Sequence, residues 1–470
     1  MKAIQNLIAG AMAAVIIGAT GGVEASQRAE LTERERAEYD HAYTIAVQAA
    51  IYGWAPVMMD VARELQTSVD APRNNGQAPI NELGPITRLW DSRDRSYATP
   101  NNDTLYLQGW ADLEEQPQVL YVPPIEDRYW MQQILDMYTE SVVDLCNATV
   151  GTAGGYFVLA KTGFTGKIPD DLPVYYSPTR YIWLAGRLGV ANNADQAAAR
   201  EIQKQFRLMP LDAYPNGGVQ PEPVVAEGAP EVVFPEGVAW FERPDEVLRD
   251  NPLASDEVLT EQFEFIGVGT GGVADLNPIR RSALNAAFPD AFHIVFDAAK
   301  YSDTPVNGWN WEYEAGRYGN DFLQRAAVNM NSVGLNSPVR AMYPKRYVDQ
   351  DGRPLNGKHR YEITMPADMP VREAVGGFWS MTMYDAVDRF MVDNEINRHK
   401  IGTTTEGLVR NPDGTLTITL SHEMPEDPKA RANWLPAPDD NFMLQIRLYE
   451  PEAAVVAGEF VLPQLYRIDE

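Results

Sequence analysis

The last hundred residues constrain the fold most, because two stretches in them alternate strictly with a period of two. In residues 415–420 three aliphatic side chains alternate with three threonines. In residues 442–448 every second position is apolar, namely Phe442, Leu444, Ile446 and Leu448. Successive side chains of a β-strand point to opposite faces, so the pattern predicts half-buried strands. We therefore predict a β-sandwich in the C-terminal part of the chain.

A second group of strands is predicted in the first half of the chain. Each is bounded by Pro, Gly or Asp, and the ranges are 104–110, 119–122, 129–138 and 156–160. Neither face of residues 129–138 is plainly polar, which favours a central strand lined on one side by a pocket.

Helices are predicted before and between these two β-rich parts. Thr32 and Glu35 have the spacing of a capping box and open a helix that runs to about Leu65. Further helices are predicted over 191–206, 246–265, 277–300 and from Asn320–Asp321 to Gly334, with loops over 68–91 and 210–235. The fold class is α+β, mainly β, with two antiparallel, jelly-roll-like β-sandwich domains bridged by helices.

The same pattern divides the chain into five parts. We predict a signal peptide over 1–25, a helical segment and loop over 26–90, a first β domain over 91–215, a loop and helical connector over 216–345, and a C-terminal β-sandwich over 346–470. At 470 residues the chain exceeds what one hydrophobic core normally holds, so more than one unit is expected.

The N-terminus has the features of a secretory signal. Lys2 precedes an apolar run from Leu7 to Ala19, and Val23-Glu24-Ala25 resembles a cleavage site. The run is shorter than the roughly 20 residues that span a bilayer, although a retained anchor is the alternative. No other segment is long and apolar enough to span. We expect a soluble periplasmic or secreted protein.

Charge and cysteine content limit the partners and the chemistry. The chain has 39 Lys and Arg against 66 Asp and Glu, a net charge of −27, and no basic cluster, so nucleic acid and anionic lipid are not expected partners. Its single cysteine, Cys146, excludes an intrachain disulfide. We predict a small buried core residue there rather than a nucleophile, because no histidine is near it in sequence.

Two further patterns bear on cofactors. Residues 267–272 match the dinucleotide fingerprint Gly-x-Gly-x-x-Gly, but the preceding residues look helical, so a Gly-rich connection with exposed amides is predicted instead. The five histidines are far apart and lack the spacing of a zinc site. We predict no cofactor and no metal, with calcium as the alternative because carboxylates and amides are abundant.

The catalytic candidates are Asp103, Asp136 and Tyr138. No Gly-x-Ser-x-Gly, Ser-x-x-Lys or Walker motif is present, which leaves acid/base chemistry by carboxylates. If both carboxylates reach one cleft of the first β unit, repulsion and burial would raise one pKa into the range of a general acid. The alternative is a buried Asp satisfied by backbone amides.

Other polar and aromatic residues are candidates for ligand binding. Each has a structural alternative, such as a turn, core packing or a loop tie. They are Asn101, Asn102, Trp309, Trp311, Arg317, Asn397 and Arg398.

Several motifs taken together resemble a known family. They are Thr99–Tyr106, Arg128–Trp130, Asp136–Thr139, Ser177–Thr179 with Trp183, Gly186 and Arg187, then Arg317–Gly319, Phe378–Asp385, Asn394–Arg398 and Asn433–Pro438. In these the chain resembles exported bacterial proteins that pair a DUF1254 domain with a DUF1214 domain. The resemblance implies two β-sandwich domains bridged by helices in an exported, oligomeric protein. Residues 140–149 depart from the family's pattern.

Two functions remain open. The first hypothesis is an enzyme, a hydrolase or lyase, that processes a small organic molecule or glycan by carboxylate chemistry, with Asp103, Asp136, Tyr138 and Arg317 lining the cleft. The alternative is a non-catalytic module of the cell envelope that binds a ligand or assembles into a homo-oligomer.

Overall fold

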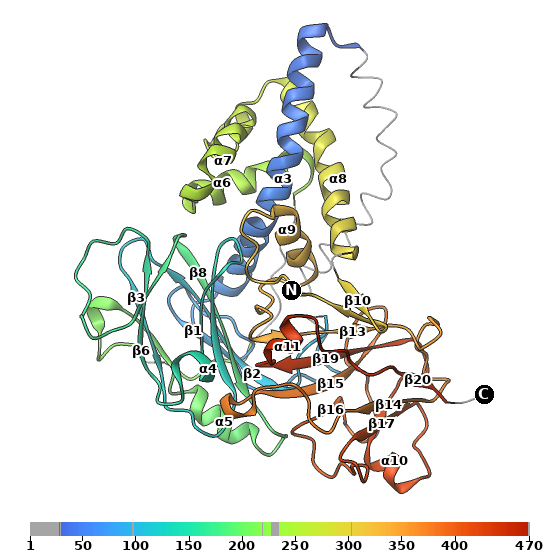
Figure 1. Cartoon of the computed structure of the whole chain (residues 1–470). Coiled ribbons are helices and arrows are strands. Elements are labelled where there is room, and N and C mark those ends of the chain that lie inside the picture. Colours follow the sequence, from blue (N-terminus) through green and yellow to red (C-terminus); the bar gives the residue numbers. More distant parts are fainter. Residues whose placement is uncertain are drawn as a thin grey trace.

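The computed structural model describes residues 28, 30–95, 98–218, 220–226, 235–301 and 303–468. The predicted signal peptide lies outside these residues. Two β-rich units lie side by side, and a group of helices projects from the place where they meet (Figure 1). The architecture is mixed and mainly β, as predicted.

The first β domain is a sandwich of a five-stranded and a four-stranded sheet. The five-stranded sheet has the order β1 (Leu83–Ile86), β2 (Thr104–Asp112), β8 (Tyr181–Gly189), β4 (Trp130–Asp136), β5 (Ser141–Cys146). The four-stranded sheet has the order β7 (Val174–Ser177), β6 (Gly155–Lys161), β3 (Gln118–Val122), β9 (Arg207–Pro210). Aliphatic and aromatic side chains of both sheets, among them Leu105, Trp130 and Phe157, form one core.

All four strands predicted here are confirmed, at slightly different bounds. Strands β1, β5, β7, β8 and β9 were not predicted. Of these, β1 carries little strand signal in Leu-Gly-Pro-Ile and pairs only as an edge of β2. Strand β4 is an inner strand and buried throughout. The pocket expected beside it lies instead on the neighbouring strands β2 and β8.

The second β domain also has two sheets. A seven-stranded sheet contains β10 (Thr304–Val306), β11 (Trp309–Trp311), β13 (Lys345–Arg346), β19 (Phe442–Tyr449), β15 (Phe378–Asp385) and β16 (Lys400–Gly402), with β12 (Ala341–Met342) paired to β19. The other contains β18 (Trp434–Pro436), β17 (Leu416–Ser421), β14 (Tyr361–Met365) and β20 (Tyr466–Arg467). The alternating apolar residues of β17 and β19 face the core between them, as predicted.

The long helices pack together although they come from distant parts of the chain. They are α3 (Glu33–Thr67), α6 (Glu242–Asp250), α7 (Glu257–Phe263), α8 (Pro278–Tyr301) and α9 (Phe322–Asn331). Their shared core includes Trp110 and Trp183, on the face of the five-stranded sheet that is turned away from the four-stranded sheet. The shorter helices are α4 (Asn147–Val150), α5 (Gln196–Gln203), α10 (Pro428–Ala432) and α11 (Ala453–Val456).

The helix predictions are confirmed in position but not always in length. The capping box of Thr32 and Glu35 opens α3. The helix expected over 246–265 is two helices, because Asn251 and Pro252 interrupt it. The helix expected over 191–206 is shortened to α5, and α9 ends at Asn331, before Gly334.

Helix α3 corrects one expectation from the sequence. Among the described residues it has the length and apolar composition that crossing a membrane requires. However, 83% of its most apolar window is buried inside the protein. A core helix passes the same composition test, because tertiary packing covers its apolar face.

The units are not continuous in sequence. Helix α3 joins helices of the 216–345 segment in one bundle. Strands β10 and β11, from the same segment, pair into the sheet of the second β domain. Cys146 is buried in a small cluster with Phe378 and Tyr449 between the two β domains, which confirms its prediction as a core residue.

Candidate functional site

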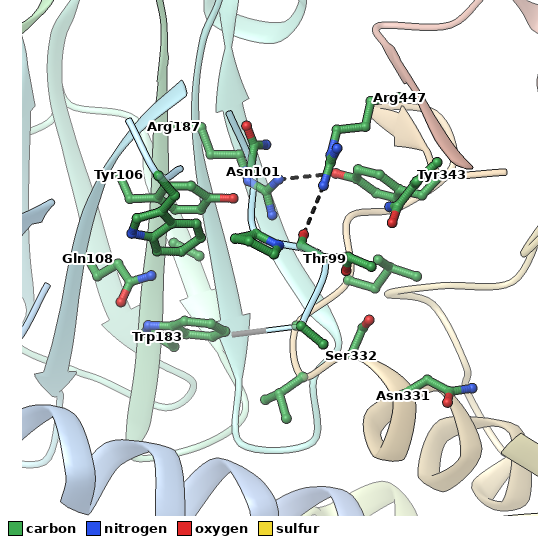
Figure 2. Close-up of a pocket in the computed structure, with 18 of the residues that line it drawn as sticks. Thr99, Asn101, Tyr106, Gln108, Trp183, Arg187, Asn331, Ser332, Tyr343 and Arg447 are labelled. Carbon is green, nitrogen blue, oxygen red and sulfur yellow. Dashed lines mark hydrogen bonds between the residues drawn. The ribbon is translucent and has the colours of Figure 1, made fainter. Parts of the chain in front are cut away.

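A cavity of about 130 Å³ lies where the two β domains meet the end of α9. All three units contribute to its wall (Figure 2). The lining residues are Gln66, Trp90, Ala98, Thr99, Pro100, Asn101, Tyr106, Gln108, Trp183, Ala185, Arg187, Asn331, Ser332, Val333, Gly334, Leu335, Tyr343, Gln445 and Arg447. The cavity thus lies between units, whereas the sequence predicted a cleft within the first β unit.

One wall is built by cross-strand pairs of β2 and β8. Tyr106 is opposite Arg187, and Gln108 is opposite Ala185. Because side chains alternate along a strand, Trp183, Ala185 and Arg187 share one face of β8. The other face of β8 packs into the core of the sandwich through Leu184.

Strand β19 of the second β domain contributes another wall. Gln445 and Arg447 line the cavity, while Leu444, Ile446 and Leu448 on the opposite face fill the domain core. The cavity thus lies between the β2–β8 face of one domain and the polar face of β19 in the other.

Two irregular segments close the remaining sides. After α9, residues 331–335 pass over Trp183, and a Cβ on Gly334 would lie only 2.4 Å from that indole. Before β2, Thr99 has a φ of +47°, which is rare for a β-branched residue. Its backbone N–H donates to the Arg389 carbonyl at 2.7 Å, and its carbonyl accepts from Arg447 Nη2 at 2.9 Å. These bonds hold a strained backbone at the cavity wall.

Aromatic rings cover much of the wall. Trp90 stacks on Tyr106 with the ring centroids 5.0 Å apart, and Trp183 stacks on Trp110 at 5.8 Å. Four buried polar atoms of lining residues have no hydrogen-bond partner in the described part of the chain: Gln108 Oε1, Trp183 Nε1, Arg187 Nε and Gln445 Oε1. Apolar rings beside a few polar groups are typical of sites that bind small organic molecules.

Arg187 is the charged group of the β8 wall. Its Nη1 donates to the Tyr343 hydroxyl at 3.2 Å, and its guanidinium lies 5.2 Å from the centre of the Tyr106 ring. Figure 2 shows the hydrogen bond from Arg187 to the Tyr343 hydroxyl and the one from Arg447 to the Thr99 carbonyl. Arg187 Nε is buried and has no partner among the described residues.

Arg447 and Asp103 belong to one buried polar network behind the cavity. Arg447 donates to the hydroxyls of Thr382 and Tyr384 at 2.9 and 2.7 Å. Asp103 accepts from Lys400 Nζ and Ser380 Oγ, both at 2.6 Å. Burial alone would raise the pKa of Asp103, but Lys400 and Arg447 outweigh burial and hold this pKa below its ordinary value.

The structure does not bring the predicted catalytic carboxylates together. Asp103 precedes Thr104, which pairs with Gly189 at one end of β8. Asp136 pairs with Ile182 near the other end. Seven residues of strand correspond to roughly 20 Å, so neither carboxylate can affect the other's pKa as expected, and neither lines the cavity.

Asp136 and Tyr138 have structural roles. Asp136 is 2% exposed and accepts the backbone N–H groups of Tyr138 and Glu140 at 2.8 and 3.0 Å. Burial, with a contribution from Glu140, raises its pKa to about 7. The Tyr138 hydroxyl donates to the Asn251 carbonyl at 2.9 Å. Satisfaction by backbone amides was the alternative for a buried Asp, and it describes Asp136.

Of the predicted ligand-binding residues, only Asn101 lines the cavity. Its side-chain oxygen accepts the backbone N–H groups of Asp103 and Thr104, so it also forms the expected turn. Asn102 donates to the Trp90 carbonyl. Both residues therefore shape the loop at the cavity mouth.

The other candidates lie away from the cavity. Trp309 and Trp311 are buried in the core of the second domain. Arg398 Nη1 donates to the carbonyls of Ala432 and Trp434, both at 2.9 Å, and Asn397 bonds His399, so both tie loops together. Arg317 is exposed.

Two further predictions concern the Gly-rich segment and a bound metal. The N–H groups of Gly269 and Gly271 both donate to Asp245 Oδ1, at 2.9 and 2.8 Å, so the exposed amides expected there hold a carboxylate of the chain itself. Within the described residues, no group of three or more His, Cys, Asp or Glu side chains is arranged to hold a metal.

Sequence reasoning missed Gln108, Gln445 and Arg447, and it named Trp183 and Arg187 only as family landmarks. A signal for them was present. In β19 the face opposite the apolar one carries Gln445 and Arg447, and in β8 an Arg shares one face with Trp183 in a strand whose other face is aliphatic. Such a polar face points to a cavity only when the facing unit is known.

The fold and the cavity define a two-β-domain protein with a site at the domain junction. A family model described as a protein of unknown function (DUF1254) matches residues 80–210, and another described as a protein of unknown function (DUF1214) matches residues 340–453. The chain therefore belongs to the family of proteins that carry these two domains together.

The chain is also similar to solved structures. The VPA0106 protein from Vibrio parahaemolyticus has a TM-score of 0.69 and 26% identity, over 91% of this chain and 100% of that chain. An uncharacterized protein from Burkholderia cenocepacia has a TM-score of 0.43 and 12% identity, over 93% and 96%. No curated protein matches the chain.

Proposed function

We propose that this protein binds a small organic molecule in the cavity at the domain junction. The observation that carries the proposal is the cavity of about 130 Å³ itself, whose wall combines the rings of Trp90, Tyr106 and Tyr343 with the guanidinium groups of Arg187 and Arg447. A bound molecule with a flat apolar part and a few polar groups would supply both kinds of contact.

The cavity favours binding over carboxylate catalysis. None of the described residues that line it is Asp or Glu. Acid/base catalysis requires a titratable group within hydrogen-bond reach of the reacting atoms, and Asp103 is already paired with Lys400. The binding alternative from the sequence is therefore the function that we propose. Export and homo-oligomer formation stay predictions.

A ligand screen with two matched variants tests the proposal. Gln108 and Gln118 are both buried glutamines on strands with a partnerless Oε1, but only Gln108 lines the cavity. A compound present at 100 times its Kd should stabilise the native protein by about 2.7 kcal/mol in thermal unfolding. We expect Gln108→Leu to weaken binding about tenfold, because a hydrogen bond to the ligand is lost.

The control variant Gln118→Leu should respond to the same compound like the native protein. An equal response of Gln108→Leu and Gln118→Leu would place the binding site elsewhere. A panel of aromatics, acids, alcohols and sugars that leaves the native melting temperature unchanged would argue against the function itself.

A further inference from the structure

We infer that the ligand of this cavity is an organic anion, an aromatic carboxylate, whose carboxylate group is held by Arg187. The inference rests on the proposed function and adds the chemical class of the ligand. It starts from the charge of the cavity wall. The chain has 66 acidic and 39 basic side chains, yet among the described residues that line the cavity are Arg187 and Arg447 and no Asp or Glu.

Neither arginine has a counter-ion of its own. Among the described residues, no carboxylate lies within 4.0 Å of the guanidinium nitrogens of Arg187 or Arg447. The nearby Asp103 carboxylate is paired with Lys400 at 2.6 Å. Arg187, Arg447, Lys400 and Asp103 together therefore carry a net positive charge in a protein whose overall charge is −27.

Of the two arginines, Arg187 is the one with free bonding capacity. Arg447 uses its two terminal nitrogens on Thr382, Tyr384 and the Thr99 carbonyl. Arg187 makes one side-chain hydrogen bond within the described residues, from Nη1 to Tyr343, which leaves its Nη2 without a partner there. A guanidinium presents a planar fork that matches a carboxylate, and this match makes arginine the usual partner of bound carboxylates.

The rest of the wall fits a planar ring. Ala185 separates Arg187 from Trp183 on the same face of β8, and its small side chain leaves room over the strand. The rings of Trp90, Tyr106 and Trp183 line the cavity beside the arginine. In another protein, an apolar cavity of about 150 Å³ binds benzene, so the 130 Å³ here suits a single ring.

One other buried arginine also has unpartnered nitrogens among the described residues, but it lies outside the cavity. Arg325 is 1% exposed, is surrounded by the rings of Tyr52, Tyr138 and Phe322, and likewise has partnerless nitrogens among the described residues. It does not line the cavity, so no ligand could reach it there. Arg325 therefore provides a matched control for Arg187.

Calorimetric titration with benzoate and with benzamide tests the inference, because the two probes share a ring and differ in charge. We expect the native protein to bind benzoate at least about tenfold more tightly than benzamide. Arg187→Gln should raise the Kd for benzoate about tenfold to a hundredfold and leave the Kd for benzamide within about twofold of the native value. Arg187→Lys keeps the positive charge but not the planar fork. Its Kd for benzoate should therefore lie between those of the native protein and of Arg187→Gln. Arg325→Gln should leave the preference for benzoate unchanged.

The outcomes separate this inference from the proposed function. If benzamide binds as tightly as benzoate, or if Arg187→Gln weakens both probes equally, the ligand is not an anion held by Arg187, while the cavity remains a binding site. If neither probe binds the native protein, the inference is wrong whatever the screen of neutral compounds shows. Circular dichroism of each variant establishes that it is folded before titration.

Discussion

Single polar residues in this protein do more for the fold than for chemistry. Asp136 accepts two backbone N–H groups at the end of β4 and is almost fully buried. Burial disfavours its charged form, so its pKa is raised to about 7. A pKa in this range often marks a general acid, but Asp136 lies away from the cavity, and here the value reports burial.

The raised pKa predicts an unusual pH dependence. Between the ordinary value of 3.8 and about 7, the unfolded chain loses the Asp136 proton while the folded chain keeps it. The free energy of unfolding must therefore fall as pH rises through this window. Asp136→Asn removes this contribution. The free energy of unfolding of the variant, relative to that of the native protein, should therefore rise by roughly 2–4 kcal/mol between pH 4 and pH 8.

Urea unfolding of both proteins at several pH values measures this difference. Asp112→Asn is the control, because the pKa of Asp112, which is paired with Arg180, is lowered instead. Between pH 4 and pH 8 the difference between that variant and the native protein should stay nearly constant, because a lowered pKa places the titration of Asp112 below its ordinary value of 3.8. A pH-independent difference for Asp136→Asn would contradict a raised pKa at this position.

At the scale of elements, close approach decides what the connections can contain. Gly334, just beyond α9, has a φ of +69° and packs directly on Trp183. The sequence marked it as the end of a helix, and the glycine instead allows residues 331–335 to reach the cavity wall. A glycine is required for two reasons: the backbone has a positive φ, and the Trp183 indole leaves no room for a Cβ.

This double requirement can be separated by two substitutions. Gly352 has a φ of +79°, but a Cβ there would contact nothing within 4 Å. Gly352→Ala should thus cost only the left-handed backbone conformation, about 1–2 kcal/mol. Gly334→Ala should cost more, because the added Cβ must displace Trp183, and it should also weaken ligand binding. Thermal unfolding of both variants gives the comparison, and equal losses would mean that the indole moves without cost.

At the scale of the whole molecule, Asp103 joins the two β domains. It belongs to the segment before β2, whereas Lys400, Ser380 and Tyr449, which bond its carboxylate, all belong to the second domain. Asp103 is 1% exposed. Removing one member of a buried ion pair leaves the other charge without compensation, which typically costs 3–5 kcal/mol.

We therefore expect Asp103→Asn to lower the free energy of unfolding by about 3–5 kcal/mol. Lys400→Met should have a similar effect, and the double variant should lose much less than the two single losses combined. The surface pair of Asp112 and Arg180 lies within one domain, and Asp112→Asn should cost at most about 1 kcal/mol. Urea unfolding measures all four variants, and an additive double variant would rule out a coupled pair.

The sequence alone indicated several of the strands and most of the long helices. Period-two alternation marked β17 and β19, and a capping box marked the start of α3, because local geometry and burial of one face leave their pattern in consecutive residues. The two β domains and the helices between them followed from the same patterns.

Only the tertiary structure decided which polar residues meet. Arg187 and Arg447 are 260 positions apart in sequence and line one cavity, while Asp103 and Asp136, close in sequence, lie near opposite ends of β8. A strand's pattern tells which side chains share a face, but it carries no information about the unit packed against that face. The cavity is a property of that packing. For this reason the sequence did not show that Asp103 and Asp136 lie away from the cavity or that two arginines line it.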